Sequence, residues 1–308
     1  MFVLYTADLV RLVERHSLQV HLYADDTQVF GSCPPRDVDA LQARLTACLD
    51  DVALWMRANR LQLNTDKTEL LWCATARRRN QLPSTPLRVG SHLVNPVTSV
   101  RNLGIYIDAD LSGRTHVTKT AAACFAALRQ LRGARRSIPT PAYKSLVVSL
   151  VLNRLDYGNA TLSGLPDFQC RRLQAVLNAA AKSIFRLQRS DHVTPALIEL
   201  HWLSAADRVN FKIATLVYRC LHGIAPRYLS SALHRVTEME TRRRLRSSAD
   251  TDILLIPRSR LVTVGDRSFA VVGPRRWNSL PETLRTAPSL PSFKRQLKTV
   301  LFLRYYSQ

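Results

Sequence analysis

Apolar and polar residues alternate along the first part of the chain in a way that predicts a helix, a hairpin and a second helix. Residues 1–15 carry apolar side chains at helical spacing, which is typical of an amphipathic helix. Residues 18–31 read LQVHLYADDTQVFG, and the apolar residues on both sides of Asp25–Asp26 predict two strands joined by a tight acidic turn. After two prolines, a helix capped by Asp37 is expected to reach about Ala58 and to pack its apolar stripe against the sheet.

Short strands and turns are expected from residue 60 to residue 110. A polar turn at residues 64–68 precedes a predicted strand near residues 69–74, and an arginine- and proline-rich loop follows. Apolar runs then predict short strands at residues 87–89, 93–94 and 103–107. Gly104 lies inside the last of these and would permit a bulge or a close backbone approach. Asp108 and Asp110 are explained more simply as loop and helix-cap residues than as metal ligands.

From residue 112 onward the pattern is almost wholly helical. The apolar periodicity predicts helices over residues 115–131, 143–155 and 168–187, a helical stretch from 194 to about 229, and a terminal helix over 289–304. Composition alone gives residues 265–281 as a loop. We also expect a boundary near residues 190–194 and a polar, cationic linker at about 237–251.

The charge balance indicates a polyanionic partner. Lysine and arginine number 44 against 23 aspartate and glutamate, a formal net charge of +21, in a chain of 308 residues of which 46% are hydrophobic. So large a cationic excess in a globular composition favours nucleic acid as the partner. No run approaches the roughly 18 apolar residues of a membrane span, and the start of the chain does not have the pattern of a signal peptide. The length is enough for about two domains.

The cysteines favour an intracellular protein with reduced thiols. Six of them are scattered along the chain without a C-x-x-C pair, so we expect neither disulfides nor a structural zinc site. Cys220 and His222 are close in sequence, but two candidate ligands without a second pair are better explained by packing in the core.

Asp25 and Asp26 admit two interpretations from the residues alone. Aspartate is a favoured turn residue, so the pair could simply close a hairpin. Two adjacent carboxylates at an exposed turn also repel each other unless a cation lies beside them, and their oxygens suit Mg²⁺. Spacing alone leaves both interpretations open, because short motifs also match by chance.

The wider context resembles a known family. Tyr23-Ala24-Asp25-Asp26 between apolar strands resembles the Y-A-D-D box of reverse transcriptases of non-LTR (LINE-type), Jockey-like retrotransposons. The segments FVLYTADL, LNTDKTELL, VRNLGIYID and PRRWNSLPETLR resemble further parts of the same family, so that the likeness runs from about Phe2 to Arg304. The resemblance implies an α+β, mainly helical fold: a partial palm with a small antiparallel sheet over residues 1–110, thumb-like helices over 111–190, and a helical C-terminal region over 191–308.

The resemblance also implies an activity, RNA-directed DNA synthesis with Mg²⁺. Asp25 would be the direct metal ligand and Asp26 its neighbour, while Tyr23 and Lys67 would lie near the incoming nucleotide; alternatively, Lys67 is a lysine in a solvated turn. The family takes a third aspartate and a Gln-Gly loop from segments that the 24 residues before Asp25 do not contain. Asp8 does not correspond to that aspartate. We therefore expect a fragment with little or no polymerase activity by itself.

The cationic residues of the helical part are expected to contact the phosphates of an RNA template and a DNA primer. The expected contacts are Arg129, Arg132, Arg135 and Arg136 on the exposed side of the helices and Arg242, Arg243 and Arg244 in the linker. An ordinary solvated face is the alternative explanation for each helix. The family's mode of insertion implies a nuclear location and no membrane partner. Two other hypotheses stay open: a non-catalytic nucleic-acid-binding protein derived from the element, and a genomic relic that folds poorly.

Overall fold

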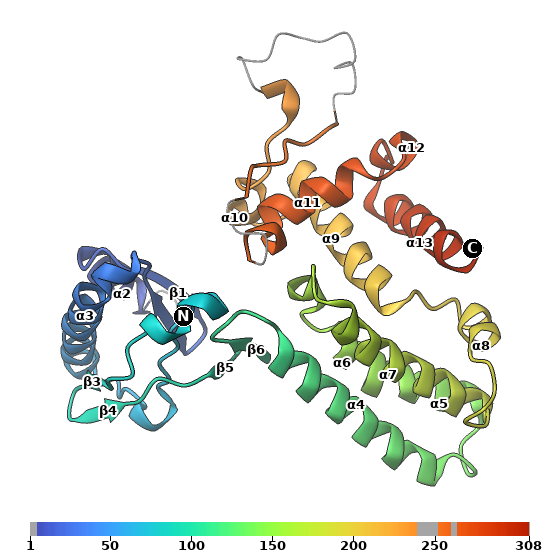
Figure 1. Ribbon diagram of the computed structural model, residues 1–308, viewed down its shortest axis with the longest axis horizontal. Helices are drawn as coiled ribbons and strands as arrows, with labels where there is room; N and C mark the ends of the chain where they lie inside the picture. The colour runs from blue at the N-terminus through green and yellow to red at the C-terminus, as the bar shows by residue number, and fades with distance from the viewer. Residues whose placement is uncertain (1–4, 239–251, 260–263, 308) are drawn as a thin grey trace. The chain divides into compact units, whose positions relative to one another are not determined.

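The computed structural model describes residues 5–238, 252–259 and 264–307, and Figure 1 shows its helices and strands. The chain divides into two compact units, Met1–Ser112 and Gly113–Gln308. The first combines helices with short antiparallel strands and the second is helical, so the expected α+β, mainly helical class is confirmed. No helix in the described ranges is long and apolar enough to cross a membrane.

Unit 1 begins with the predicted helix, hairpin and helix. These are α2 (Ala7–Arg15), β1 (Gln19–Tyr23), β2 (Asp26–Phe30), the short 3-10 turn η1 (Pro35–Asp37) and α3 (Val38–Ala58). The apolar stripe of α3 is buried at Val38, Leu41, Leu45, Cys48 and Val52. It packs with the buried leucines of α2 and with the inward side of the hairpin into one small core. Asp37 lies at the N-cap of α3, but its side chain makes no capping hydrogen bond.

The remainder of unit 1 corrects one expected strand and shortens another. It contains the 3-10 turns η2 (Thr65–Lys67) and η3 (Ala76–Gln81) and the hairpins β3 (Leu87–Val89) with β4 (His92–Val94) and β5 (Ser99–Asn102) with β6 (Ile105–Asp108). Residues 69–74 do not form a strand, since only Leu70 makes an isolated bridge, to Pro96. The strand expected at 103–107 is confirmed from Ile105 onward as β6, whereas Leu103 and Gly104 form the turn of the β5–β6 hairpin, with φ of 45° and 83°. Two positive φ values are typical of a type I′ turn, which a pattern of apolar residues does not reveal.

Asp108, the last residue of β6, and Asp110 in the loop both bind Ser112 before the next helix, but neither caps that helix. Asp108 is buried, and its Oδ2 accepts a hydrogen bond of 3.1 Å from the Ser112 hydroxyl. Asp110 Oδ1 accepts one of 3.0 Å from the Ser112 backbone N–H. The N-cap itself is Gly113, whose φ is 70°.

Unit 2 is built from helices, most of them predicted by the periodicity. In chain order they are α4 (Arg114–Ala134), α5 (Thr140–Val147), the π-helical turn η4 (Val148–Leu152), α6 (Asn153–Asp156), the 3-10 turn η5 (Asn159–Leu162), α7 (Asp167–Phe185), α8 (Thr194–Glu199), α9 (Ala205–Leu221), α10 (Arg227–Ser230), the 3-10 turns η6 (Val236–Glu238) and η7 (Gly265–Arg267), α11 (Phe269–Asn278), α12 (Glu282–Arg285) and α13 (Leu290–Tyr306). α11 corrects the loop expected at 265–281, because its buried side (Val271, Val272 and Trp277) outweighs the glycine and proline in its sequence.

One hydrophobic core runs through unit 2. It joins residues of α4, α5 and α7 to residues of α9, α11 and α13. Its largest fully buried side chains are aromatic: Trp277, Tyr143, Tyr218 and Phe293. Because residues on both sides of Ser190 share this core and one compact unit, residues 190–194 are a connection between helices rather than a packing boundary.

Candidate functional site

The two acidic residues lie at the tip of the hairpin β1–β2. Tyr23 pairs with Asp26, which leaves Ala24 and Asp25 as a two-residue turn. The turn is therefore Ala24–Asp25, and Asp26 is the first residue of β2 rather than part of the turn. Ala24 has φ of 52°, a left-handed value that favours glycine over residues with a Cβ. The carboxylate of Asp25 is thus presented by a strained backbone.

The two faces of the hairpin have opposite surroundings. Val20, Leu22 and Val29 pack toward the small core of unit 1. On the other face, Tyr23 is 60% exposed, and Asp26, which pairs with it across the strands, is also exposed. Directly paired residues of an antiparallel ladder point to the same face. Tyr23 and Asp26 therefore share the solvent face of the hairpin.

The hairpin has no third strand among the described residues. A side-chain hydrogen bond links it to β5, where Asn102 Nδ2 donates to Gln28 Oε1 over 2.9 Å. The outer backbone groups of a two-stranded sheet are free to pair with another extended segment.

Asp25 and Asp26 offer the type of ligand that a magnesium ion prefers, but only some of the ligands that it needs. Both are exposed, and within the described chain neither forms an ion pair. Carboxylate oxygens suit Mg²⁺, which proteins usually hold by one or two carboxylates together with substrate phosphates. In the described part of the molecule, no group of three or more His, Cys, Asp or Glu side chains is arranged to hold a metal ion. The pair therefore fits as half of a metal site that substrate phosphates or a further acid would complete.

Lys67 lies at the end of η2 in the predicted polar turn, which is confirmed. Its backbone N–H donates to Asn64 Oδ1 over 3.2 Å, and the Thr68 hydroxyl donates to the Asn64 carbonyl over 2.9 Å. These bonds fix the turn, while the Lys67 side chain is exposed. Among the described residues it forms no ion pair with Asp25 or Asp26. Its expected place beside a nucleotide stays a prediction.

The arginines expected to bind phosphate differ in exposure. Arg129 and Arg132 on α4 and Arg136 just after it are exposed. Arg135 is only 7% exposed, so its expected place on the outer side is wrong. Its guanidinium donates to the Ile138 carbonyl (3.1 Å), the Thr140 hydroxyl (3.0 Å) and the Ile184 carbonyl (3.0 Å).

Arg135 is held inside because it satisfies helix ends. Ile184 lies in the last turn of α7, where backbone carbonyls lack helical partners and a cation is favourable. The guanidinium also lies 4.5 Å from the centre of the Tyr143 ring, which adds a cation–π contact. Arg135 is therefore a structural residue. Arg242, Arg243 and Arg244 lie outside the described residues.

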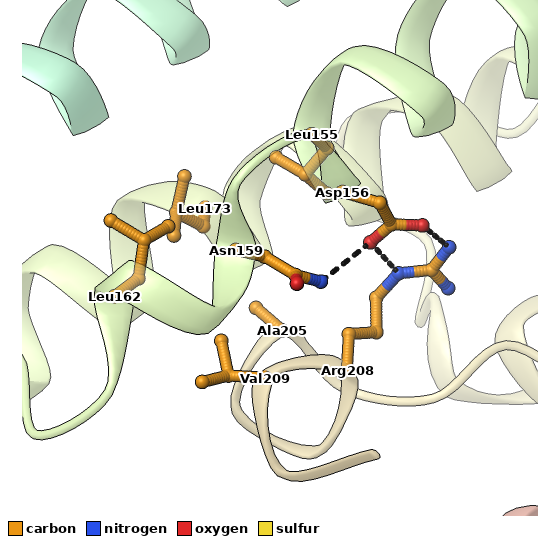
Figure 2. A pocket seen from close by; sticks show the side chains of 8 residues that line it. All are labelled: Leu155, Asp156, Asn159, Leu162, Leu173, Ala205, Arg208 and Val209. Carbon is orange, nitrogen blue, oxygen red and sulfur yellow. Dashed lines mark hydrogen bonds and ion pairs between the residues drawn. The ribbon is translucent and has the colours of Figure 1, made fainter. Parts of the chain in front are cut away.

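A partly buried polar group that the sequence did not indicate joins α6, η5 and α9 (Figure 2). Arg208 donates to both oxygens of Asp156, over 2.8 and 2.6 Å, and Asn159 Nδ2 donates to the same carboxylate over 3.3 Å. They line a small pocket whose enclosed space, about 10 Å³, is no more than one water molecule needs. This is far below the roughly 300–1,000 Å³ of ordinary ligand sites. The group holds helices together, and residues 52 positions apart give no local signal of it.

Cys48 and Cys124 are not candidate nucleophiles. Cys48 and Cys124 are fully buried, and burial raises the pKa of each thiol to about 11. At neutral pH both are protonated and weakly reactive. The expected packing in the core is confirmed for Cys220, which is buried, whereas His222 is exposed and stacks on the buried Tyr218 with ring centres 3.8 Å apart.

A comparison with models of protein families found no match, and comparisons with curated proteins and with solved structures likewise found none. The function must therefore be argued from the residues, their geometry and their charge.

Proposed function

We propose that this chain descends from the RNA-directed DNA polymerase of a non-LTR retrotransposon, and that β1–β2 is the acidic hairpin of its palm. The observation that carries the proposal is Asp25, which is exposed in a two-residue turn and is followed by Asp26, the residue that pairs with Tyr23 across the strands. The left-handed backbone of Ala24 supports it, because strained residues cluster at functional sites. Unit 1 would then be a partial palm, and α4 and the helices after it would be thumb and C-terminal helices.

Asp25 and Asp26 are the residues that would hold Mg²⁺ in this proposal. When bound, the ion would neutralise a triphosphate and make a primer 3′-hydroxyl more nucleophilic. The chain's own contribution is to present the carboxylates in water, with Tyr23 on the same face. Because no third ligand joins them within the described ranges, the expected metal affinity and the expected polymerase activity of the isolated chain are low.

Two measurements test this proposal. Manganese binding followed by electron paramagnetic resonance is expected to give a weak site that Asp25→Asn removes, while Asp8→Asn, an exposed aspartate of α2, leaves it unchanged. Primer extension on an RNA template is expected to give little or no incorporation. Metal binding that survives the combined change of Asp25 and Asp26 to Asn would overturn the assignment of the hairpin. Robust Asp25-dependent synthesis would instead show that the site is complete.

A second candidate is a non-catalytic nucleic-acid-binding protein derived from the same element. The net charge of +21 and the exposed Arg129, Arg132 and Arg136 favour it. If about 6 to 10 phosphates are contacted, affinity should fall by roughly 10³ to 10⁵ between 50 and 200 mM salt. Binding with that slope, unchanged by Asp25→Ala, would favour this candidate over the catalytic one. A nuclear location is part of both proposals.

A further inference from the structure

The terminal helix α13, red in Figure 1, packs one apolar row into the core and exposes cationic residues beside it. Phe293, Leu297 and Leu301 are at most 2% exposed and form part of the core of unit 2. Its sequence, LPSFKRQLKTVLFLRYY, contains no acidic residue. Lys294, Arg295, Lys298 and Arg304 are all exposed, and within the described residues none of them forms an ion pair.

Helix stability explains only one of these cations. Arg304 lies in the last turn, where a positive charge is favourable next to the helix C-terminus. Lys294 and Lys298 are four residues apart, and like charges at that spacing destabilise a helix by a few tenths of a kcal/mol. Arg295 adds a third charge beside them. Three adjacent unpaired cations on one helix face therefore call for an anionic partner.

An exposed aromatic ring lies on the same side of the helix. Tyr305 follows Lys298 by seven residues, which is two helical turns, and is 47% exposed. Its ring meets the half-buried Tyr306 edge-on, with centres 4.8 Å apart. The Tyr306 hydroxyl donates to the Trp202 carbonyl over 2.9 Å, which holds that neighbour in place. Lys294, Arg295, Lys298 and Tyr305, here called the α13 face, thus extend over roughly 16 Å of helix.

We infer that the α13 face binds single-stranded nucleic acid, with the three cations on phosphates and Tyr305 stacked on an unpaired base. Cationic grooves that carry exposed aromatic rings are typical of single-strand binding. An anionic membrane fits less well, because a helix that lies on a bilayer inserts its apolar face. In α13 that face is already used in the protein core. The inference shares with the proposed function only the assumption of a nucleic-acid partner, and it assigns a surface far along the chain from the acidic hairpin.

The test compares two variants with the same change in charge. In one, Lys294, Arg295 and Lys298 are replaced by Glu; in the control, Arg11, Arg44 and Arg57 of α2 and α3, also exposed, are replaced by Glu. Binding of fluorescent oligo(dT) and oligo(rU) of about 15 nucleotides is followed by anisotropy at several salt concentrations. Three lost contacts should lower the salt slope by about 2 and the affinity on the order of 100-fold at 0.1 M salt. An equal loss in the control would overturn the inference, since net charge alone would then explain it.

Further variants address folding, stacking and the membrane. If the Glu variant does not fold, as judged by circular dichroism, a variant with the same three cations changed to Gln replaces it. That variant should also lower the salt slope of binding. Tyr305→Leu should weaken binding to single strands about fivefold or more and leave binding to a duplex unchanged. Equal effects on both would overturn the stacking. Stronger α13-dependent binding to phosphatidylserine vesicles than to oligonucleotides would overturn the choice of partner.

The outcomes for the two sites are independent. If the Asn variants of Asp25 and Asp26 leave metal binding unchanged while the α13 charges still control oligonucleotide binding, the hairpin assignment fails and the α13 inference holds. If metal binding follows Asp25 but the α13 variant binds oligonucleotides like the control, only the α13 inference fails.

Discussion

The two units use their hydrophobic residues differently. Among the residues that the structure describes, the main core of unit 1 contains nine buried residues, none of them aromatic, whereas that of unit 2 contains forty, including Trp277, Tyr143, Tyr218 and Phe293. Unit 1 has 112 residues and unit 2 has 196, so the difference exceeds what size explains. In unit 1 the exposed hairpin packs on a small hydrophobic core. In unit 2 a large hydrophobic core holds helices whose charged side chains are exposed. Local stability is therefore expected to be lower in unit 1.

The largest expected effect comes from one pair of matched core deletions. Leu297→Ala in unit 2 and Leu41→Ala in unit 1 remove the same atoms from sites that are 0% and 3% exposed. Such changes cost about 2–5 kcal/mol, and the cost rises where the surroundings cannot collapse. We expect Leu297→Ala near the upper end and Leu41→Ala near the lower end. Hydrogen exchange should be used to measure each unit separately, and a larger loss for Leu41→Ala would contradict the comparison.

Neighbouring arginines give the next largest effect. Arg135→Met removes a guanidinium that three acceptors share, which should lower the free energy of unfolding of unit 2 by about 1–3 kcal/mol. Arg136→Met is the control, because that side chain is exposed and its loss should cost within about 0.5 kcal/mol. Nucleic-acid affinity should fall more in Arg136→Met than in Arg135→Met, because only the Arg136 side chain is exposed. Urea titration measures the stability of each variant, and oligonucleotide binding measures its affinity. Equal losses of stability in the two variants would refute the structural role of Arg135.

Arg135 also shows where sequence reasoning reaches its limit. Periodicity correctly predicted α3, α4, α7 and α13, because a buried helix face repeats along the chain. It could not show that the loop between α4 and α5 turns Arg135 inward, since its partners lie up to 49 residues away. The same limit applies to the turn at Leu103–Gly104 and to the Asp156–Arg208 pair. Both depend on backbone twist or on distant partners, which leave no pattern among neighbouring residues.

The hairpin was accessible to sequence reasoning for the opposite reason. Its strands alternate and its turn is local, so β1 and β2 follow from residues 18–31 alone. What the pattern could not give is the place of Asp26 in the strand and the left-handed backbone of Ala24. Both depend on the pairing register of β1 with β2. The same sequence could pair one residue out of step, so its composition does not determine that register.

Cysteine labelling compares the local stabilities of the two cores, for which we expect a smaller difference in free energy. Cys48 in unit 1 and Cys124 in unit 2 are both 0% exposed, so each should react only when its surroundings open. We expect Cys48 to react about tenfold faster at pH 8, which corresponds to roughly 1.4 kcal/mol less local stability. Mass spectrometry of the labelled chain can follow both sites at once, with the exposed Cys73 as the reference for an accessible thiol. Equal rates would mean that the two cores open together.

The same thiols give a pH dependence with a definite sign. Burial raises the pKa of Cys48 and Cys124 from 9.0 to about 11, so the folded state favours the protonated thiol. Below about pH 9 this adds no pH dependence, whereas between pH 9 and 11 the unfolded chain loses protons more readily and stability falls. Cys→Ala at either position should reduce that fall for its own unit. Thermal unfolding midpoints at pH 8, 9.5 and 10.5 would check this, and a midpoint that rises with pH would contradict the assigned direction.

The smallest expected effect separates stability from function within unit 1. Ala24→Gly relieves the left-handed φ of 52° and should stabilise the hairpin by about 0.5–1 kcal/mol, although part of the gain is offset by the greater freedom of glycine in the unfolded chain. Leu103→Gly, at φ of 45° in the turn of β5–β6, is the control for the same relief away from the acids. If the strain serves the acidic turn, Ala24→Gly should weaken manganese binding while Leu103→Gly leaves it unchanged. A gain in stability with unaltered metal binding would mean that Ala24 is simply a poor residue for its turn, and the case for the hairpin would then depend on its carboxylates alone.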